Sequence, residues 1–501
     1  MKKKIALLLS VVLAITAITG CGAGTKDNAG TAAVSETAAD ETTAGEKASE
    51  DTAPEEIVTL KWILIGNEQP KNYDAWVANI NPYLEEKIGV NIEVEVVSWG
   101  DWGTRTGNII NTNEPFDIIH TNSGSYYNQV SLGALLDITD LVKTAAPDLY
   151  AYIPEMYWRA ASVAGKYYSV PTYKDSSATW YYIWDMDVAE ELVPNYKDIH
   201  SYEDMAKALY AVKEAKGEAP FAMMKDGAKH IMDVYDQMGT GLPAIGVRWD
   251  DESMTVVNPL EQEDILVQLD AVHEMYKAGL INADAPNLDQ VPTYHVVSTG
   301  QGWPMAAKTV WGPNMGVEDR AEAVQVGDTM LNASTVCGSL NAISASCEHP
   351  EKALEFLQLV NLDSYVRDAF FYGLEGDDFT YTEDGKVQKK DEPTWPMAGY
   401  AQGTFFTVSM MADQEFNQWD EVKALNEQAK PSVLLGFSFD DSNVESEMAN
   451  CRSVFSKYSA EFFTGAKDPR ELVKKMSEEF KTAGLDAIIA EAQKQIDATM
   501  K

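Results

Sequence analysis

The side chains of this sequence that could do chemistry are aromatic rings placed close to polar groups. Trp99 and Trp102 flank Gly100-Asp101, and Tyr126-Tyr127 follows Asn122-Ser123-Gly124-Ser125. A sugar stacks its C–H face on a flat ring, while its hydroxyls bond to amides, carboxylates and ammonium groups. The pattern favours a carbohydrate site, although each ring taken alone is equally typical of core packing.

Other chemistries lack their motifs. The six histidines show no zinc-ligand spacing, and neither G-x-x-x-x-G-K-[ST] nor G-x-S-x-G occurs. The acidic segment Asp377–Asp391 has Thr380 and Thr382 where a calcium loop needs carboxylates. Catalytic carboxylates cannot be located among 78 acidic residues. We therefore expect no cofactor, no metal and no catalytic residue.

The elements that would position these residues are alternating strands and helices. Alternation of apolar and polar residues predicts strands, and apolar residues three and four apart predict helices. The expected order is strand 60–65, helix 70–87, strand 90–96, helix 101–111 and strand 116–120. This β-α-β-α-β order predicts a parallel sheet with polar loops at its carboxyl edge.

A second set of elements follows the aromatic stretch Trp180–Trp184. Ser201 with Asp204 is typical of a helix start, as is Asp468 before Pro469. The further elements expected are strands at 220–224 and 339–344, helices at 260–278 and from 350, a hairpin at 381–387, and helices on either side of Gly484. The fold class is α/β, in two units with a helical C-terminal region.

The start of the chain is typical of an exported lipoprotein. Lys2-Lys3-Lys4 precedes the apolar run Ile5–Thr19, which is too short to span a membrane. Ile18-Thr19-Gly20-Cys21 resembles a lipobox, which makes residues 1–20 a signal peptide and Cys21 the lipidation (palmitate) site. An ordinary secretory signal is the alternative. Residues 22–56 have one large apolar side chain and read as an acidic tether.

The net charge limits the possible binding partners, and the number of cysteines limits the possible disulfide bonds. The formal net charge is −39, from 39 basic and 78 acidic residues, which argues against nucleic acid. After Cys21, three cysteines remain: Cys337, Cys347 and Cys451. Two states of these cysteines stay possible: a disulfide bridge between Cys337 and Cys347, or three buried free thiols.

Several motifs together resemble a known family, the lipid-anchored extracellular solute-binding proteins of bacterial carbohydrate ABC importers. The resemblance is to the family 1 type, in the subgroup with an uncharacterised conserved C-terminal region. The residues that carry it are Leu60-Lys61-Trp62, Ser98-Trp99-Gly100-Asp101-Trp102, Phe116-Asp117-Ile118-Ile119, Ser169–Asp175, Asn341–Ser344, His349–Ala353, Gly436–Asp440, Asp468-Pro469 and the helix 490–496. Asn443-Val444-Glu445 departs from the Pro-Val-Lys expected there.

The resemblance implies a two-lobed periplasmic-binding-protein-like fold of type II, with the lobes joined by a hinge. The expected divisions are 21–56 for the lipidated Cys and tether, 57–181 for lobe 1 with a return at 306–340, 182–305 for lobe 2 with a return at 341–430, and 431–501 for the helical region. It also implies a lipid-anchored monomer outside the cell membrane that delivers a carbohydrate, an oligosaccharide in our prediction, to permease subunits. The ligand-binding residues predicted are Glu68, Gln69, Asn122, Ser123, Tyr126, Lys174, Asp175, Trp180, Trp303 and Trp311.

Two other functions stay open at this point. A binding protein for a peptide or another non-sugar solute would use the same fold. A surface-anchored enzyme that degrades polysaccharide would need a pair of carboxylates and would turn its substrate over.

Overall fold

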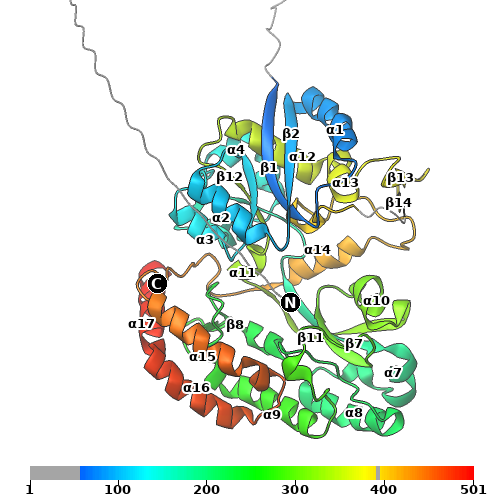
Figure 1. The fold of residues 1–501 in the computed structure, drawn as a ribbon, viewed down its shortest axis with the longest axis vertical. Helices are drawn as coiled ribbons and strands as arrows, with labels where there is room; N and C mark the ends of the chain where they lie inside the picture. The colour runs from blue at the N-terminus through cyan, green and yellow to red at the C-terminus, as the bar shows by residue number, and fades with distance from the viewer. Residues whose placement is uncertain (1–56, 391–394, 501) are drawn as a thin grey trace, which may run out of the picture. The chain divides into compact units, whose positions relative to one another are not determined.

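The computed structural model describes residues 57–390 and 395–500, all within the compact unit Glu55–Lys501. The expected signal peptide, Cys21 and the whole expected tether lie outside the described residues. The longer elements form two α/β lobes, each built on its own sheet (Figure 1).

The first lobe is built on a five-stranded sheet in the order β2-β1-β3-β12-β6. Its strands are β1 (Val58–Gly66), β2 (Val90–Ser98), β3 (Ile118–Thr121), β6 (Val170–Pro171) and β12 (Leu340–Ile343). Strands β2 and β3 pair in parallel with β1, while β12 runs antiparallel to β3. Helix α1 (Tyr73–Ile88) ends at Gly89, whose φ of 67° suits a residue without Cβ. Helix α2 (Trp102–Thr112) completes the expected β-α-β-α-β order, which is confirmed.

The second lobe is built on a four-stranded sheet in the order β10-β7-β11-β15. Its strands are β7 (Ala178–Asp185), β10 (Val297–Gln301), β11 (Ala321–Leu331) and β15 (Lys430–Pro431). Helices α7 (Met186–Leu192), α8 (Tyr202–Lys216) and α9 (Glu263–Lys277) contribute buried side chains to this lobe's core. Ser201 caps α8 as expected, because its Oγ accepts from the Asp204 amide.

The structure reverses the expected lobe assignment of two late strands. The sequence placed 306–340 in lobe 1 and 341–430 in lobe 2, yet β11 lies in the second sheet and β12 in the first. Helices α12 (Pro350–Leu362) and α13 (Ser364–Tyr372) join the core of the first lobe. The pattern along a strand indicates which of its side chains face a core, but it does not select the strands that pair with it, so neither strand could be assigned to a sheet from its own residues. The strand expected at 220–224 is reduced to isolated bridges at Phe221.

The helical C-terminal region belongs to the core of the second lobe. It consists of α15 (Glu445–Phe463), α16 (Pro469–Ala483) and α17 (Leu485–Thr499). Met448, Phe462 and Ile488 are each 0% exposed and pack in one cluster with α8 and α9. Figure 1 shows α15 and α16 beside α9, while α17 packs on α15 and α16.

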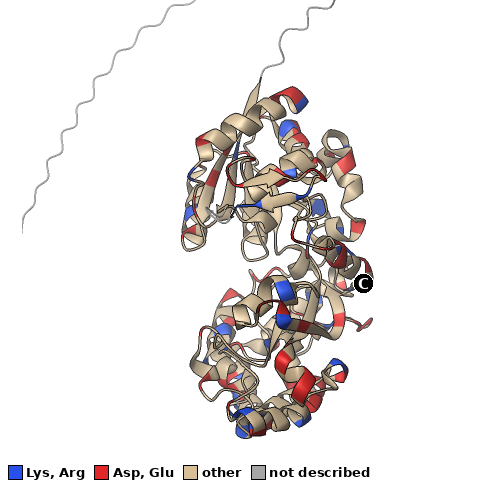
Figure 2. Ribbon diagram, turned by 90° about the vertical axis from the view of Figure 1, so that its right-hand side faces the viewer, with Lys and Arg blue, Asp and Glu red and all other residues tan. Residues whose placement is uncertain are grey.

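The remaining elements are short. They are α3 (Tyr126–Ser131), α4 (Leu141–Ala145), α5 (Pro147–Tyr152), α6 (Glu155–Ala160), β4 (Ser162–Val163), β5 (Lys166–Tyr167), β8 (Tyr235–Asp236), β9 (Val247–Arg248), α10 (Gly312–Met315), α11 (Ala333–Val336), the hairpin β13 (Phe379–Tyr381) and β14 (Val387–Lys389), α14 (Gln418–Gln428), the π-helix Ala307–Trp311, and the 3-10 turns Tyr196–Asp198, Lys229–Val234, Pro259–Glu261, Ala285–Asn287, Glu318–Arg320 and Gly399–Ala401. Acidic and basic residues are interspersed on the helices of both lobes (Figure 2).

Three segments carry the chain between the lobes: 172–177 after β6, 332–339 after β11, and 426–429 at the end of α14. Asn426 joins the first and third of these crossing segments. Its Oδ1 accepts from the Ser177 amide at 3.2 Å and from the Ser177 hydroxyl at 3.0 Å. Its Nδ2 donates to the carbonyl of Lys174.

Candidate ligand-binding site

An exposed pair of aromatic rings lies at the carboxyl edge of the first sheet. Trp99, directly after β2, is 50% exposed. Its ring stacks on that of Tyr400, with centroids 6.0 Å apart and planes 19° apart. The Trp99 indole nitrogen donates to Asn67 Oδ1 at 2.8 Å, which holds the ring in one orientation. Two stacked rings with one open face form a surface suited to the C–H face of a sugar.

Charged and polar groups surround this pair. The Lys174 ammonium lies 5.7 Å from the centre of the Tyr400 ring and 2.7 Å from Asp175 Oδ1. His120, 0% exposed at the end of β3, lies between the rings of Trp102 at 5.4 Å and Tyr400 at 6.1 Å. Burial, reinforced by the charge of Lys174, lowers the pKa of His120 to about 3. The imidazole is therefore neutral at physiological pH, and Lys174 and Asp175 supply the local charge.

The other predicted residues of the first lobe differ in how free their polar groups are. Glu68 is exposed in the loop after β1. Gln69 uses both ends of its amide on the edge strand β2: Nε2 donates to Val94 O at 3.0 Å, and Oε1 accepts from the Val96 amide at 2.9 Å. These bonds explain its place in the fold without a ligand.

The loop after β3 holds three predicted residues. Asn122 Oδ1 accepts from the Gly124 amide at 3.0 Å, and the Ser123 amide donates to Cys337 O at 2.7 Å. Both side chains are partly exposed. Tyr126 is 0% exposed, and its hydroxyl donates to Ala161 O at 2.8 Å, so its ring packs in the core rather than against a ligand. The apolar ring faces inward because the first turn of α3 places it against α6.

A second aromatic group lies where β7 enters the second lobe. Trp180 is partly buried; its indole nitrogen donates to Asp233 Oδ2 at 2.6 Å, and its ring lies 4.8 Å from that of His230. Burial raises the pKa of Asp233 to about 6, although the bond from Trp180 opposes that shift. Burial also lowers the pKa of His230 to about 4. The carboxyl group thus fixes the orientation of a partly exposed indole.

Trp303 and Trp311 follow β10 in the second lobe. Trp303 donates its indole N–H to Gln418 Oε1 at 3.1 Å and lies 5.5 Å from Trp419 on α14. Trp311 ends the π-helix and rests on the backbone of β10, where a Cβ at Gly300 would lie 2.8 Å from its ring. Both rings are partly exposed, and no hydrogen bond or ring contact joins either of them to Trp99 or Trp180. The structure therefore brings Lys174 and Asp175 to the Trp99–Tyr400 pair and leaves the other predicted residues in separate groups.

The residues that sequence reasoning did not select are Asn67, Trp99, His120, Asp233 and Tyr400. Trp99 carried a signal, because it belongs to an aromatic motif directly after a predicted strand. Tyr400 is 301 positions from Trp99 and has no local pattern that links it to β2. Asp233 is one acidic residue among 78.

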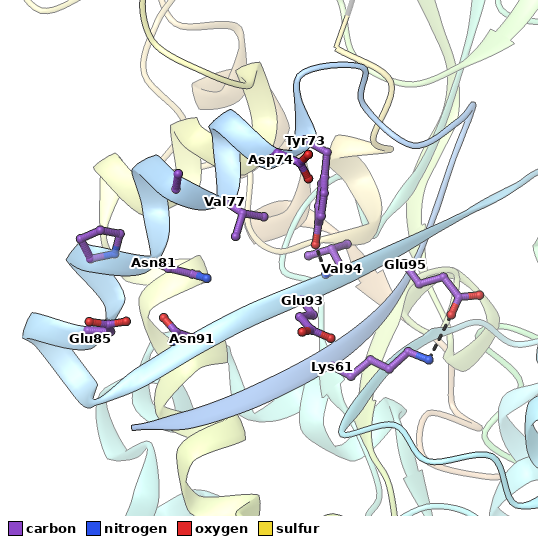
Figure 3. Close-up of a pocket in the computed structure, with 12 residues that line it drawn as sticks. Lys61, Tyr73, Asp74, Val77, Asn81, Glu85, Asn91, Glu93, Val94 and Glu95 are labelled. Atoms are coloured by element: carbon purple, nitrogen blue, oxygen red, sulfur yellow. Dashed lines mark hydrogen bonds and ion pairs between the residues drawn. The ribbon is translucent and has the colours of Figure 1, made fainter. Parts of the chain in front are cut away.

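A groove of about 630 Å³ lies elsewhere, on the outer edge of the first sheet between α1 and β2 (Figure 3). There Tyr73 accepts from the Val94 amide at 2.7 Å, and Asn81 accepts from the Ile92 amide at 3.0 Å. Lys61 and Glu95, 3.2 Å apart, line its other wall. These side chains cover the edge strand and explain the groove as a structural feature.

The described residues offer neither a metal site nor a membrane-spanning helix. No group of three or more His, Cys, Asp or Glu side chains is arranged to hold a metal ion. Over the same residues, no helix combines the length and the apolar character that a membrane span requires. Cys337, Cys347 and Cys451 are free, so the Cys337–Cys347 bridge does not form in this structure.

Comparison with known proteins places this geometry in context. Residues 67–366 match the family model of the bacterial extracellular solute-binding proteins, and residues 433–501 match a domain of unknown function (DUF3502). A carbohydrate ABC transporter substrate-binding protein of Streptococcus pneumoniae is 26% identical over 458 residues, which cover 88% of this chain and 91% of that protein.

Solved structures share the fold. A crystal structure of the N-glycan transport solute-binding protein NgtS from Streptococcus pneumoniae superposes with a TM-score of 0.79 at 24% identity, over 88% of this chain and 99% of that one. The same protein in complex with Man5GlcNAc superposes with a TM-score of 0.67 at 25% identity, over 88% and 98% of the two chains. An HMO-binding, ABC-transporter-associated solute-binding protein of Bifidobacterium longum infantis superposes with a TM-score of 0.65 at 16% identity, over 89% of this chain and 99% of that one.

Proposed function

This chain belongs to the bacterial extracellular solute-binding proteins, and we propose that it captures an oligosaccharide between its two lobes and delivers it to the permease of an ABC importer. The observation that carries the proposal is the Trp99–Tyr400 pair, half open to solvent beside Lys174 and Asp175. The similarity to a carbohydrate ABC transporter substrate-binding protein supports the same class of cargo.

Capture follows from the arrangement of the lobes. One aromatic surface lies on the first lobe at Trp99, and a second lies on the other lobe at Trp180. Rotation about the three crossing segments would bring a ligand held on one lobe into contact with the other. The ligand stabilises the closed form by the contacts that exist only there. Two separate stacking surfaces favour a chain of sugars over a monosaccharide. The NgtS complexes with Man1GlcNAc and Man5GlcNAc indicate the first oligosaccharides to test as ligands.

The position of the protein outside the cytoplasm agrees with the family. Attachment through a lipid on Cys21, with residues 22–56 as a tether and the protein acting as a monomer, is part of the proposal. Its support is the sequence Ile18-Thr19-Gly20-Cys21 after an apolar run. Mass spectrometry of the N-terminal peptide from a membrane fraction tests it: an unmodified Cys21 would refute the anchor.

Binding is tested with the Cys21→Ser protein lacking residues 1–20, by calorimetry against Man5GlcNAc, Man1GlcNAc, other oligosaccharides and short peptides. We expect an oligosaccharide to bind, and Trp99→Ala to weaken it about tenfold, since stacking contributes about 0.5–1.5 kcal/mol beyond area burial. The matched control is Tyr210→Ala on α8, because Tyr210 is 55% exposed and lies in the second lobe away from Trp99. It should leave the affinity unchanged.

The outcomes separate the competing functions. Binding of peptides alone would retain transport and refute carbohydrate as cargo. Chromatography of the recovered ligand checks for turnover: cleaved sugar would mean that the chain is an enzyme. Equal affinity of the wild type and Trp99→Ala would remove the Trp99–Tyr400 pair from the site.

A further inference from the structure

The segment 399–404, which carries Tyr400, is held by side chains along its whole length. All six of its consecutive carbonyl oxygens accept side-chain hydrogen bonds, and three residues donate these bonds: Ser339, Asn341 and Arg367. Ser339 Oγ donates to Tyr400 O at 3.1 Å, and Asn341 Nδ2 donates to the next two carbonyls, each at 3.0 Å. A short segment outside any sheet seldom has every carbonyl bound to a side chain, because loops run over the surface, where their backbone groups are open to water.

Arg367 contributes the other three bonds from α13. Its guanidinium donates to Thr404 O at 2.6 Å, to Gly399 O at 2.9 Å and to Gly403 O at 3.5 Å, and a further N–H reaches Gln402 Oε1 at 2.7 Å. The side chain is 0% exposed, and among the described residues no carboxylate lies within ion-pair distance of it. Burial lowers its pKa to about 9. Burying a cation among neutral carbonyls costs free energy of folding. In return, the guanidinium holds the segment 399–404 in one conformation.

The same residues connect this segment to the hinge. The carbonyl of Ser339 accepts from the amide of Thr172 at 3.2 Å and from its hydroxyl at 2.8 Å. Ser339 thus contacts the crossing segment 172–177 through its backbone and Tyr400 through its side chain. Asn341 follows on β12, where Trp62 donates its indole N–H to Asn341 Oδ1 at 3.2 Å. The support of Tyr400 is therefore continuous with the first sheet and with two of the crossing segments.

We infer that Ser339, Asn341 and Arg367 are positioning residues that hold Tyr400 in place as the ring on which a ligand stacks in the first lobe. The inference rests on the proposed function for its ligand, but the support itself is a property of the free protein. None of the three residues needs to touch the ligand. Each acts through Tyr400, which keeps its ring parallel to Trp99 only while the segment 399–404 keeps its shape.

A double-mutant cycle tests the inference. Kd for the oligosaccharide that binds wild type, Man5GlcNAc first, is measured for Arg367→Lys, Tyr400→Ala and the double variant. Arg367→Lys should raise Kd about 3- to 10-fold in the wild-type background and not at all in the Tyr400→Ala background. A merely structural role would lower the melting temperature in both backgrounds and leave Kd unchanged, or change Kd equally in both; either result overturns the inference.

Two further variants keep the test decisive. Ser339→Ala removes one hydrogen bond and serves if Arg367→Lys does not fold; it should raise Kd about 2- to 3-fold, again only when Tyr400 is present. Ile488→Val, in the C-terminal helices, is the control that lowers stability without changing Kd.

A ligand-free measurement separates this inference from the proposed function. Acrylamide quenching of Trp99 is obtained as the difference between the protein and its Trp99→Phe variant. Ser339→Ala and Arg367→Lys should expose Trp99 further, because Tyr400 no longer covers one face. If no sugar binds but quenching rises, the proposed function fails and the support of Tyr400 stands. If quenching is unchanged, the inference fails whatever binds.

Discussion

Asn426→Ala removes the amide that joins two crossing segments. Asn426 is 3% exposed, and its replacement leaves the Ser177 amide and the Ser177 hydroxyl without this partner, while the Lys174 carbonyl loses one bond and keeps the one from the Ser176 amide at 2.9 Å. A buried unsatisfied group costs about 1–3 kcal/mol, and the hydroxyl can rotate to a new acceptor, so we expect a loss of about 3 kcal/mol. Unfolding entropy of about 2.1 cal/mol/K per residue, over roughly 450 residues, converts this to a fall of about 3 °C in Tm.

Differential scanning calorimetry of the ligand-free protein measures this change. The control is Asn443→Ala, because Asn443 makes one exposed bond to Glu491 and its loss should cost less than about 0.5 kcal/mol. Asn426→Asp is the conservative variant: it keeps an acceptor for Ser177 but loses the donor to Lys174, so its Tm should also fall. A Tm for Asn426→Ala within about 1 °C of that of Asn443→Ala would refute the view that this amide stabilises the crossing segments.

Three further predictions concern the second lobe, the pH dependence and the thiols. Gly465→Ala should destabilise the protein by about 2 kcal/mol or more in urea unfolding, because its φ is +72° and a Cβ would lie 2.7 Å from backbone atoms of Val272 and His273. The control is Gly316→Ala, which has a φ of +71° but open space around the added Cβ, so it measures the backbone strain without the clash. Equal losses of unfolding free energy in the two variants would refute the close packing at Gly465. The pKa of Asp233 is raised from 3.8 to about 6, so the folded state holds this proton more tightly than the unfolded state. The stabilisation from the protonated carboxyl group is therefore present below about pH 4 and is lost as the pH rises through about 6. Asp233→Asn should remove this part of the pH dependence of the urea midpoint, and a profile identical to that of the wild type would contradict the prediction. Thiol titration of the denatured Cys21→Ser protein without reductant should find three thiols, and one thiol would show a disulfide.

The sequence alone was sufficient for the family and for much of the local structure. The resemblance to solute-binding proteins of carbohydrate ABC importers is confirmed by the match of residues 67–366. The alternation in β2 and the cap residues Gly89, Ser201 and Asp468 act over a few positions, so the pattern contains all the information that these elements need.

The site depended on contacts that no local pattern records. The amide of Gln69 is bound to β2, and the ring of Tyr126 lies in the core, although both residues stand in loops that predict a ligand surface. Local sequence identifies a loop at the end of a strand, but the direction of each side chain depends on which backbone groups remain unpaired nearby.

The lobe assignment of β11 and β12 and the pairing of Trp99 with Tyr400 were decided only by the tertiary structure. Arg367 is the clearest case, since a helical arginine next to an aspartate is typical of a surface position, yet here it is fully buried. Three of its four hydrogen-bond partners are backbone carbonyls 32 to 37 positions away, which any sequence supplies. Residue type determines what a side chain can bind, and the packing of distant segments determines what it meets.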